Sequence, residues 1–135
     1  MDLVALDNGL QKLVLKRNEL SVMGYDNEAY DELEEELHDM EDDFSEKFGA
    51  YLEEAFYDVH DEFCPDSDVL MPIAYLGKKY QVEGKKFNVD FSQGVYVEMD
   101  DYPDQETKLV LLPSPTRIIL QITKEERNVV WTAGQ

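Results

Sequence analysis

The chain has 135 residues, of which 43% are hydrophobic and 32% charged, and its formal net charge is −19 at pH 7. A chain of this size and composition can bury one core, so we expect a single domain over residues 1–135. The negative charge disfavours direct binding to nucleic acid or to an anionic membrane, because both carry the same sign.

Neither a secretory signal nor a membrane-spanning segment is predicted. The first residues lack the basic region and the apolar run of a signal peptide, and no stretch approaches the ~20 apolar residues that span a bilayer. The single cysteine, Cys64, excludes an internal disulfide and suits a reducing compartment. We therefore expect a cytoplasmic protein.

The first predicted element is a helix over residues 2–22. Its apolar residues recur at helical spacing, at Leu3, Leu6, Leu10, Leu13, Val14 and Leu20. Gly24 offers a stop just before the next helix, so the two helices are expected to form an antiparallel hairpin over residues 2–63. In that hairpin, Lys16 and Arg17 would lie near the acidic start of the second helix.

The second predicted element is a very long helix over residues 26–63, with Asp26 as its cap and Cys64-Pro65 as its end. The pattern fits either one straight helix or two segments that meet near Gly49. Its apolar residues are spaced three or four apart and form one stripe: Tyr30, Leu33, Leu37, Met40, Phe44, Phe48, Leu52, Ala55, Val59 and Phe63.

Almost all of the net charge belongs to this stretch. Residues 26–68 contain nineteen carboxylates and one base, Lys47, which together give −18. Eight pairs of carboxylates lie four residues apart, and their repulsion costs on the order of 2 to 4 kcal/mol in total. Two interpretations remain open: a solvated acidic face, or an anionic surface kept for a cationic partner or imitating a nucleic-acid backbone.

Residues 69–133 are predicted to form an antiparallel meander of up to seven short strands. A seven-residue unit that occurs twice, as Gly77–Glu83 and Gly84–Asp90, predicts two successive tight hairpins with type II′ Gly-Lys turns. Helices followed by a meander give an α+β fold with the helical hairpin on one sheet face. The expected strands lie at residues 70–76, 80–83, 87–91, 95–99, 108–112, 117–123 and 128–133.

The four lysines of the repeat cluster around its two turns. At these turns the lysines are expected to solubilise the rim of the sheet or to face the acidic helix. Binding of an anion is the less favoured alternative. They are Lys78, Lys79, Lys85 and Lys86.

Candidate catalytic and metal sites are weak. Glu35 and His38 have the spacing found in di-iron bundles, but His60 would lie about 33 Å further along the helix, so the two histidines cannot share an ion. Cys64 lies among carboxylates at a helix C-terminus, which opposes a reactive thiolate. The carboxylates at residues 66–68 and 100–106 lack the spacing of an EF-hand loop. We expect no cofactor and no metal, and we lean against an enzyme.

The leading hypothesis is a non-catalytic interaction protein that docks on a basic protein partner, as an inhibitor, immunity protein, adaptor or nucleic-acid mimic does. One alternative is a ligand-binding or enzymatic domain with a pocket between helix and sheet, lined by Tyr75, Tyr80, Phe87, Tyr96 or Trp131. Another is a homo-oligomer that pairs its apolar stripes. In the leading hypothesis the partner-binding residues are Glu32, Glu35, Glu36, Asp39, Asp42, Asp43, Glu46 and Glu54, with Tyr57 as an aromatic anchor.

Overall fold

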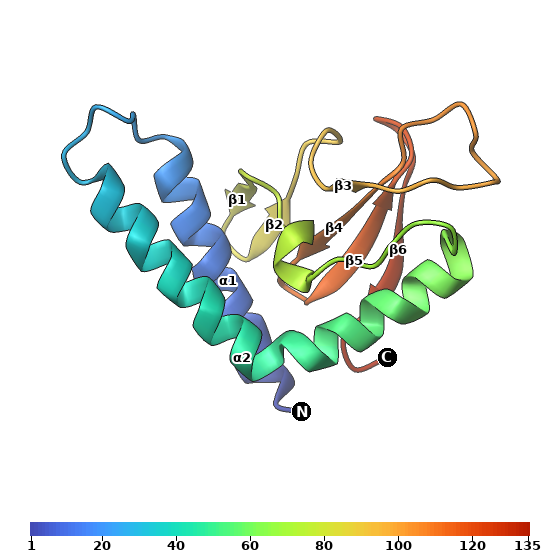
Figure 1. Ribbon diagram of the computed structural model, residues 1–135, viewed down its shortest axis with the longest axis horizontal. Helices are drawn as coiled ribbons and strands as arrows, with labels where there is room; N and C mark the ends of the chain where they lie inside the picture. Colours follow the sequence, from blue (N-terminus) through green and yellow to red (C-terminus); the bar gives the residue numbers. More distant parts are fainter.

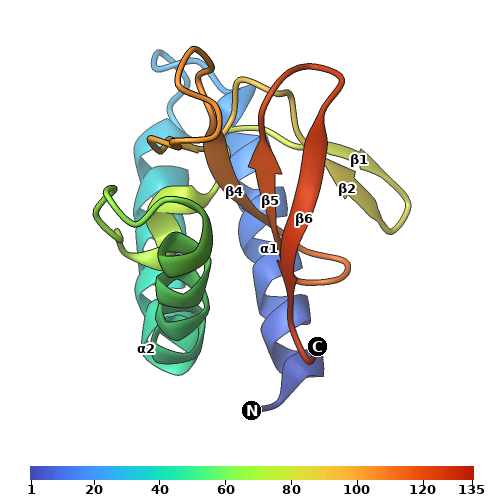
Figure 2. The ribbon, with the colours of Figure 1, turned by 90° about the vertical axis from the view of Figure 1, so that its right-hand side faces the viewer.

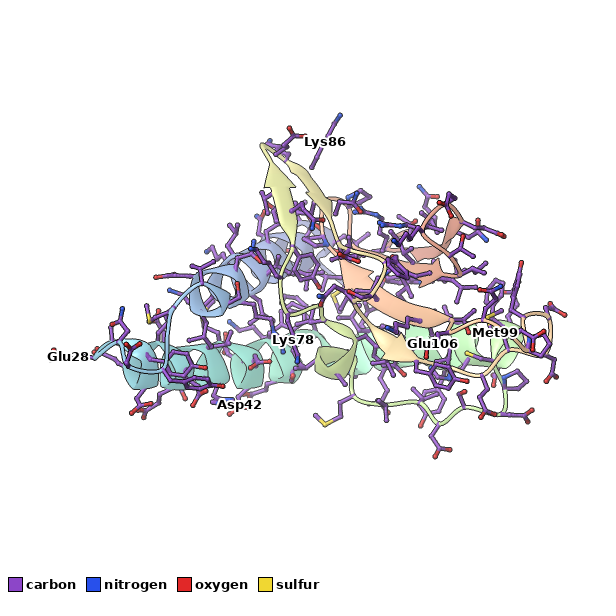
Figure 3. The ribbon with its side chains drawn as sticks, turned by 90° about the horizontal axis from the view of Figure 1, so that it is seen from above. Glu28, Asp42, Lys78, Lys86, Met99 and Glu106 are labelled. Atoms are coloured by element: carbon purple, nitrogen blue, oxygen red, sulfur yellow. The ribbon has the colours of Figure 1, made fainter.

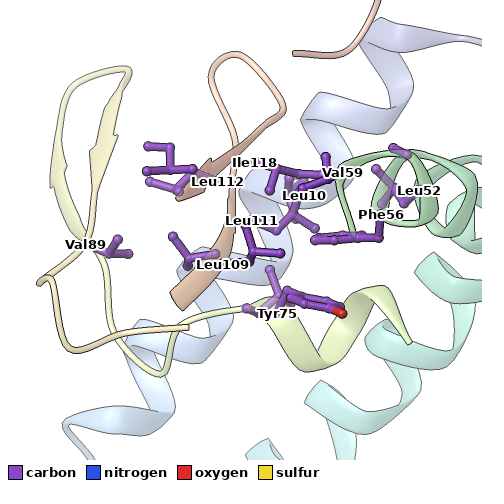
Figure 4. Close-up of a cluster of buried hydrophobic side chains, with 14 of the residues drawn as sticks. Leu10, Leu52, Phe56, Val59, Tyr75, Val89, Leu109, Leu111, Leu112 and Ile118 are labelled. Atoms are coloured by element: carbon purple, nitrogen blue, oxygen red, sulfur yellow. The ribbon is translucent and has the colours of Figure 1, made fainter. Parts of the chain in front are cut away.

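The computed structural model describes residues 1–135 and confirms the predicted α+β class. Two helices, α1 (Leu3–Ser21) and α2 (Tyr30–Phe63), precede all the strands, and one buried cluster of 26 residues joins the helices to the sheet (Figures 1 and 4). The strands are β1 (Gln81–Glu83), β2 (Lys86–Asn88), β3 (Val95–Tyr96), β4 (Lys108–Leu112), β5 (Arg117–Gln121) and β6 (Arg127–Thr132).

The two helices form the predicted antiparallel hairpin. The Asp2 carboxylate caps α1 by accepting a hydrogen bond from the Ala5 amide at 3.0 Å. At Gly9 the helices lie close together, since a Cβ placed there would be 3.5 Å from the rings of Phe44 and Phe48. A Cβ at this distance would be in ordinary van der Waals contact with both rings, so the two helices pack closely here.

Helix α2 is continuous over 34 residues and does not divide into two segments at Gly49. It is not straight, however: its first half runs along α1, and its second half turns away beneath the sheet (Figure 1). Gly49 lies just past the middle of the helix. The predicted stripe faces inward, with six of its ten positions buried and the others partly buried; the buried ones are Leu33, Leu37, Phe44, Leu52, Ala55 and Val59.

The predicted start of α2 at Asp26 is wrong. The helix begins at Tyr30, and Ala29 precedes it without any side-chain cap. Turns occupy the segment before it, where the Asn27 amide donates to the Gly24 carbonyl and the Asn27 side chain accepts from the Ala29 amide. Asn27 thus satisfies the local backbone as a turn residue, and this competes with an earlier helical turn.

The predicted strand over residues 70–76 is also wrong. A short 3-10 helix, η1 (Pro72–Tyr75), occupies this place. Proline is well suited to the first turn of a helix, because its missing N–H has no partner there anyway. Tyr75 is fully buried and stacks on Phe56 of α2 with 3.9 Å between ring centroids, so packing on α2 favours the helical turn.

Only the second unit of the repeat forms a hairpin. Strands β1 and β2 pair across Gly84 and Lys85, and Gly84 has the positive φ of 60° that the first position of a type II′ turn requires. At the first unit no hairpin forms. There the buried Tyr80 hydroxyl accepts from the Gly77 amide at 2.8 Å and donates to the Leu111 carbonyl at 2.7 Å, so this chain segment is tied to β4 instead.

The main sheet has four strands rather than seven, in the meander order β3-β4-β5-β6, and β1-β2 is a separate ribbon. Every strand pair is antiparallel, but Leu76 makes an isolated parallel bridge to Leu111. Figure 2 shows β4, β5 and β6 side by side, with α1 behind them and the two chain termini next to each other.

Candidate acidic interaction surface

The exposed side of α2 carries a dense row of carboxylates. The helix contains fifteen Asp and Glu residues and one lysine. Its apolar stripe is turned toward α1 and the sheet, so most of the acidic residues face outward, whereas Glu41 pairs with Arg17 of α1. Figure 3 shows Asp42 on the side of α2 that is turned away from α1.

Each predicted partner-binding residue is exposed. All eight carboxylates are exposed, with Glu36 and Asp43 at the border of α2 with α1, and Tyr57 is 51% exposed. Neither the core nor the sheet buries them, so the packing of the core does not require acidic residues at these positions. These residues, which we call the acidic face, are Glu32, Glu35, Glu36, Asp39, Asp42, Asp43, Glu46, Glu54 and Tyr57.

Helix α1 neutralises a small part of this charge, at the place expected from the hairpin. Lys16 lies 3.2 Å from Glu36, and Arg17 lies 2.7 Å from Glu41. The hydrogen bond to Glu36 raises the pKa of Lys16. On α2 itself Lys47 pairs with Asp43 at 3.1 Å. The other twelve carboxylates of α2 have no lysine or arginine partner within 4.0 Å.

The lysines of the repeat do not neutralise the acidic helix. None of the four makes an ion pair with any carboxylate of the chain. Figure 3 shows Lys86 at the end of the projecting β1-β2 ribbon, away from α2. Of the roles considered for these lysines, facing the acidic helix is therefore excluded for Lys86.

Tyr57 borders a shallow hollow on the outer side of α2. Ala50, Glu53, Glu54 and Tyr57 line it, and its volume is about 270 Å³. These residues are spaced three and four apart, so they share one face of the helix. The small side chain of Ala50 leaves the hollow, and two carboxylates and an aromatic ring surround it.

His60 has a structural role. It is buried, and the 3.0 Å contact from Nδ1 to the Ser67 carbonyl requires a proton on Nδ1, because a carbonyl only accepts. Nε2 then accepts from the Tyr75 hydroxyl at 2.8 Å, and this hydroxyl accepts from the Leu70 amide at 3.0 Å. The network fastens the segment after α2 to the helix.

Cys64 offers no reactive thiol. Its side chain is fully buried, and burial raises the pKa of the thiol to about 11. Because the thiolate is the nucleophile, the reactive fraction at neutral pH is very small. No group of three or more histidine, cysteine or carboxylate side chains could hold a metal ion, and this includes the clusters at residues 66–68 and 100–106.

The aromatic residues considered for a pocket between helix and sheet mostly fill the core. Tyr75, Tyr80 and Phe87 are buried at 0%, 2% and 4% exposure, and Trp131 packs edge-on against Tyr51 at 5.9 Å between centroids. Tyr96 is exposed on β3 and lines a different, shallow cavity of about 260 Å³ beside the loop after β3. These five side chains therefore do not surround one common pocket.

A cavity that the sequence did not predict lies at the loop end of the helical hairpin, where α1 connects to α2. Its volume is about 460 Å³, and Tyr25 and Tyr30 form part of its wall. The sequence signal was the pair of tyrosines beside the Gly24 turn. The lining also includes Lys78, which lies more than forty residues away in the chain from either tyrosine and could not be placed there by pattern alone.

Comparisons with protein-family models, with curated proteins and with solved structures find no match for this chain. Neither of its two helices combines the length and the apolar character that crossing a bilayer requires.

Proposed function

We propose that this protein is a non-catalytic interaction protein, and that the acidic face of α2 binds a basic protein partner. The observation that carries the proposal is the row of exposed carboxylates, most of which have no cationic partner. An inhibitor, an immunity protein, an adaptor and a nucleic-acid mimic would all use such a surface. We place this activity in the cytoplasm, where the single free thiol stays reduced.

The cost of the acidic face supports a role in binding. Carboxylates four residues apart repel each other by roughly 0.2 to 0.5 kcal/mol per pair. A helix that needed only to be soluble would gain stability by mixing lysine with glutamate, and α2 has a single lysine. The repulsion is relieved when a cationic surface covers the face, so it adds to the free energy of binding.

The spacing of the charges favours partners that bind anionic polymers. A helix of 34 residues is about 51 Å long at 1.5 Å per residue. Fifteen carboxylates over that length, three of them paired with lysine or arginine, give about one carboxylate per 3.4 Å, which is the spacing of phosphates along one strand of B-DNA. A protein surface built for a nucleic-acid backbone would therefore meet a similar charge density on α2.

Affinity capture from native cytosol tests the proposal. The immobilised protein is loaded at low salt and eluted with a salt gradient, and an electrostatic partner should elute between ~0.05 and 0.5 M. The control bait has Glu32, Glu35, Asp39 and Asp42 replaced by the matching amides. A basic protein retained by the native bait and lost from the control supports the proposal, whereas equal retention by both baits would contradict it.

A further inference from the structure

The loop end of the helical hairpin, where α1 connects to α2, projects beyond the rest of the molecule and carries exposed apolar side chains. Figure 1 shows this end extending away from the sheet, and Figure 3 places Glu28 at its extremity. Val22 is 74% exposed and Tyr25 is 87% exposed, and the Tyr25 ring lies 4.7 Å from that of Tyr30. Exposed aromatic residues beside apolar ones, on a projecting element, are typical of a binding surface.

A pocket opens beside these side chains. Leu20, Met23, Tyr25 and Tyr30 supply its apolar and aromatic walls, and its volume of about 460 Å³ lies within the range of ligand pockets. The pocket is formed by the end of α1, the start of α2 and the segment that carries Lys78. We call it the tip pocket.

Two cations border the tip pocket. Arg17 is held in place by the Gly77 carbonyl at 3.3 Å and by Glu41 at 2.7 Å, and its Nε is buried without a hydrogen-bond partner. Lys78 makes no ion pair. Cations and tyrosine rings both interact favourably with an aromatic ring, so this wall favours an aromatic occupant over an aliphatic one.

The surroundings of the tip pocket are acidic. No lysine or arginine occurs between Arg17 and Lys47. Asp26, Glu28 and Asp31 are exposed and have no ion pair. These carboxylates neighbour the pocket residues Tyr25 and Tyr30 along the chain, and positive charge on a binding segment is complementary to them.

We infer that the tip pocket receives an aromatic side chain from a basic segment of the partner protein. The inference rests on the proposed function and adds to it a second contact site for the same partner. This site is the tip pocket, which is separate from the outer side of α2. The carboxylates attract the basic segment, and the pocket then selects the segment that presents an aromatic ring. Anchors of this kind carry much of the free energy in protein interfaces.

Two pentapeptides test the inference in an NMR titration of the full chain at low salt. One has tryptophan between two pairs of lysines, and the other has alanine in its place. The tryptophan peptide should bind about fivefold more tightly or better, with the largest shifts at Leu20, Tyr25 and Tyr30. Tyr25→Ala should remove this preference, and Tyr96→Ala, which changes an exposed tyrosine on β3, should keep it.

The outcomes separate the two proposals. Equal, salt-sensitive binding of both peptides would overturn the tip pocket and leave the acidic face intact. If neither peptide binds, the proposed function fails, and the neutral probe N-acetyl-tryptophanamide then tests the pocket alone. Shifts by that probe that are confined to the tip pocket and lost in Tyr25→Ala support the pocket; their absence overturns it.

Discussion

At the scale of single residues, Tyr75 joins η1 to α2 and to the segment between them. Its hydroxyl contacts the His60 side chain and the Leu70 amide, and its ring stacks on Phe56. Tyr75 is fully buried, so no water replaces a lost partner at this place. Burial also raises the pKa of the Tyr75 hydroxyl, which therefore stays protonated and can donate to His60 throughout the neutral range.

Tyr75→Phe should lower the free energy of unfolding by about 1 to 3 kcal/mol, because it leaves Nε2 of His60 and the Leu70 N–H without their partner. Denaturant unfolding measures the change. Tyr96→Phe is the matched control, since Tyr96 is exposed and its hydroxyl makes no hydrogen bond within the protein. A similar loss in both variants would mean that the network around His60 adds nothing specific.

Cys64 should resist thiol reagents in the folded protein. Its thiol is fully buried and its pKa is about 11, so both access and thiolate formation oppose reaction. The rate of reaction with an aromatic disulfide reagent at pH 8 should rise at least about a hundredfold when denaturant is added. A fast reaction without denaturant would show that the end of α2 opens readily.

At the scale of elements, the bend of α2 brings its second half beneath the sheet. Gly49 lies near the middle of this helix, and a Cβ placed there would meet only the Ser45 side chain, at 3.9 Å. Its φ is not in the left-handed region, so an alanine fits the same backbone. The glycine therefore costs helix stability without a visible packing benefit.

Gly49→Ala should raise the free energy of unfolding by about 0.5 to 1 kcal/mol. The melting temperature and circular dichroism of the variant measure the effect. Gly84→Ala is the contrasting control and should destabilise, because Gly84 has a φ of 60° at a type II′ turn. Destabilisation by Gly49→Ala would show that the bend depends on glycine.

Sequence patterns predicted the long elements well and the short ones poorly. The period of α1 and α2 spans many turns, and the apolar runs of β4, β5 and β6 are separated by turn residues, so their place and order are confirmed. The segment over residues 70–80 follows contacts instead: Tyr75 packs on α2, and the Tyr80 hydroxyl bonds to β4. Such long-range contacts override local preference and leave no periodic signal in the sequence.

Of the candidate site, the acidic face was predictable from the sequence and the tip pocket was not. The acidic face follows from helical periodicity, because residues off the apolar stripe must point outward. The tip pocket depends on where the segment carrying Lys78 passes the loop end of the hairpin. That crossing is set by contacts such as the one between Asn18 and the Tyr80 carbonyl, 2.9 Å long, which join distant parts of the chain.

At the scale of the whole molecule, the charge is divided unevenly. Residues 69–135 carry nine acids and eight bases and are nearly neutral, while the stretch around α2 holds almost the entire net charge. The protein thus presents one strongly anionic side to any partner. A field of this kind acts over about 8 Å at physiological ionic strength, so it affects encounter as well as contact.

Moderate salt should stabilise the fold. Only three carboxylates of α2 have a lysine or arginine partner, and ions screen the repulsion among the rest. The melting temperature should rise from low salt to ~0.3 M NaCl. In the variant with Glu32, Glu35, Asp39 and Asp42 replaced by amides, the low-salt melting temperature should be higher and the rise smaller. A flat curve for the native protein would show that its acidic residues do not repel one another appreciably.

The association rate with the basic partner captured at low salt tests the central claim most directly. The same four replacements on α2 are compared with a control in which Asp100, Asp101, Asp104 and Glu106, all exposed in the loop before β4, become the matching amides. Both variants lose four charges, so they have equal net charge. The account predicts that the association rate of the α2 variant is at least about tenfold lower than the native rate, while the rate of the loop variant stays within about twofold of it. Equal slowing of both variants, or no slowing of either, would contradict it.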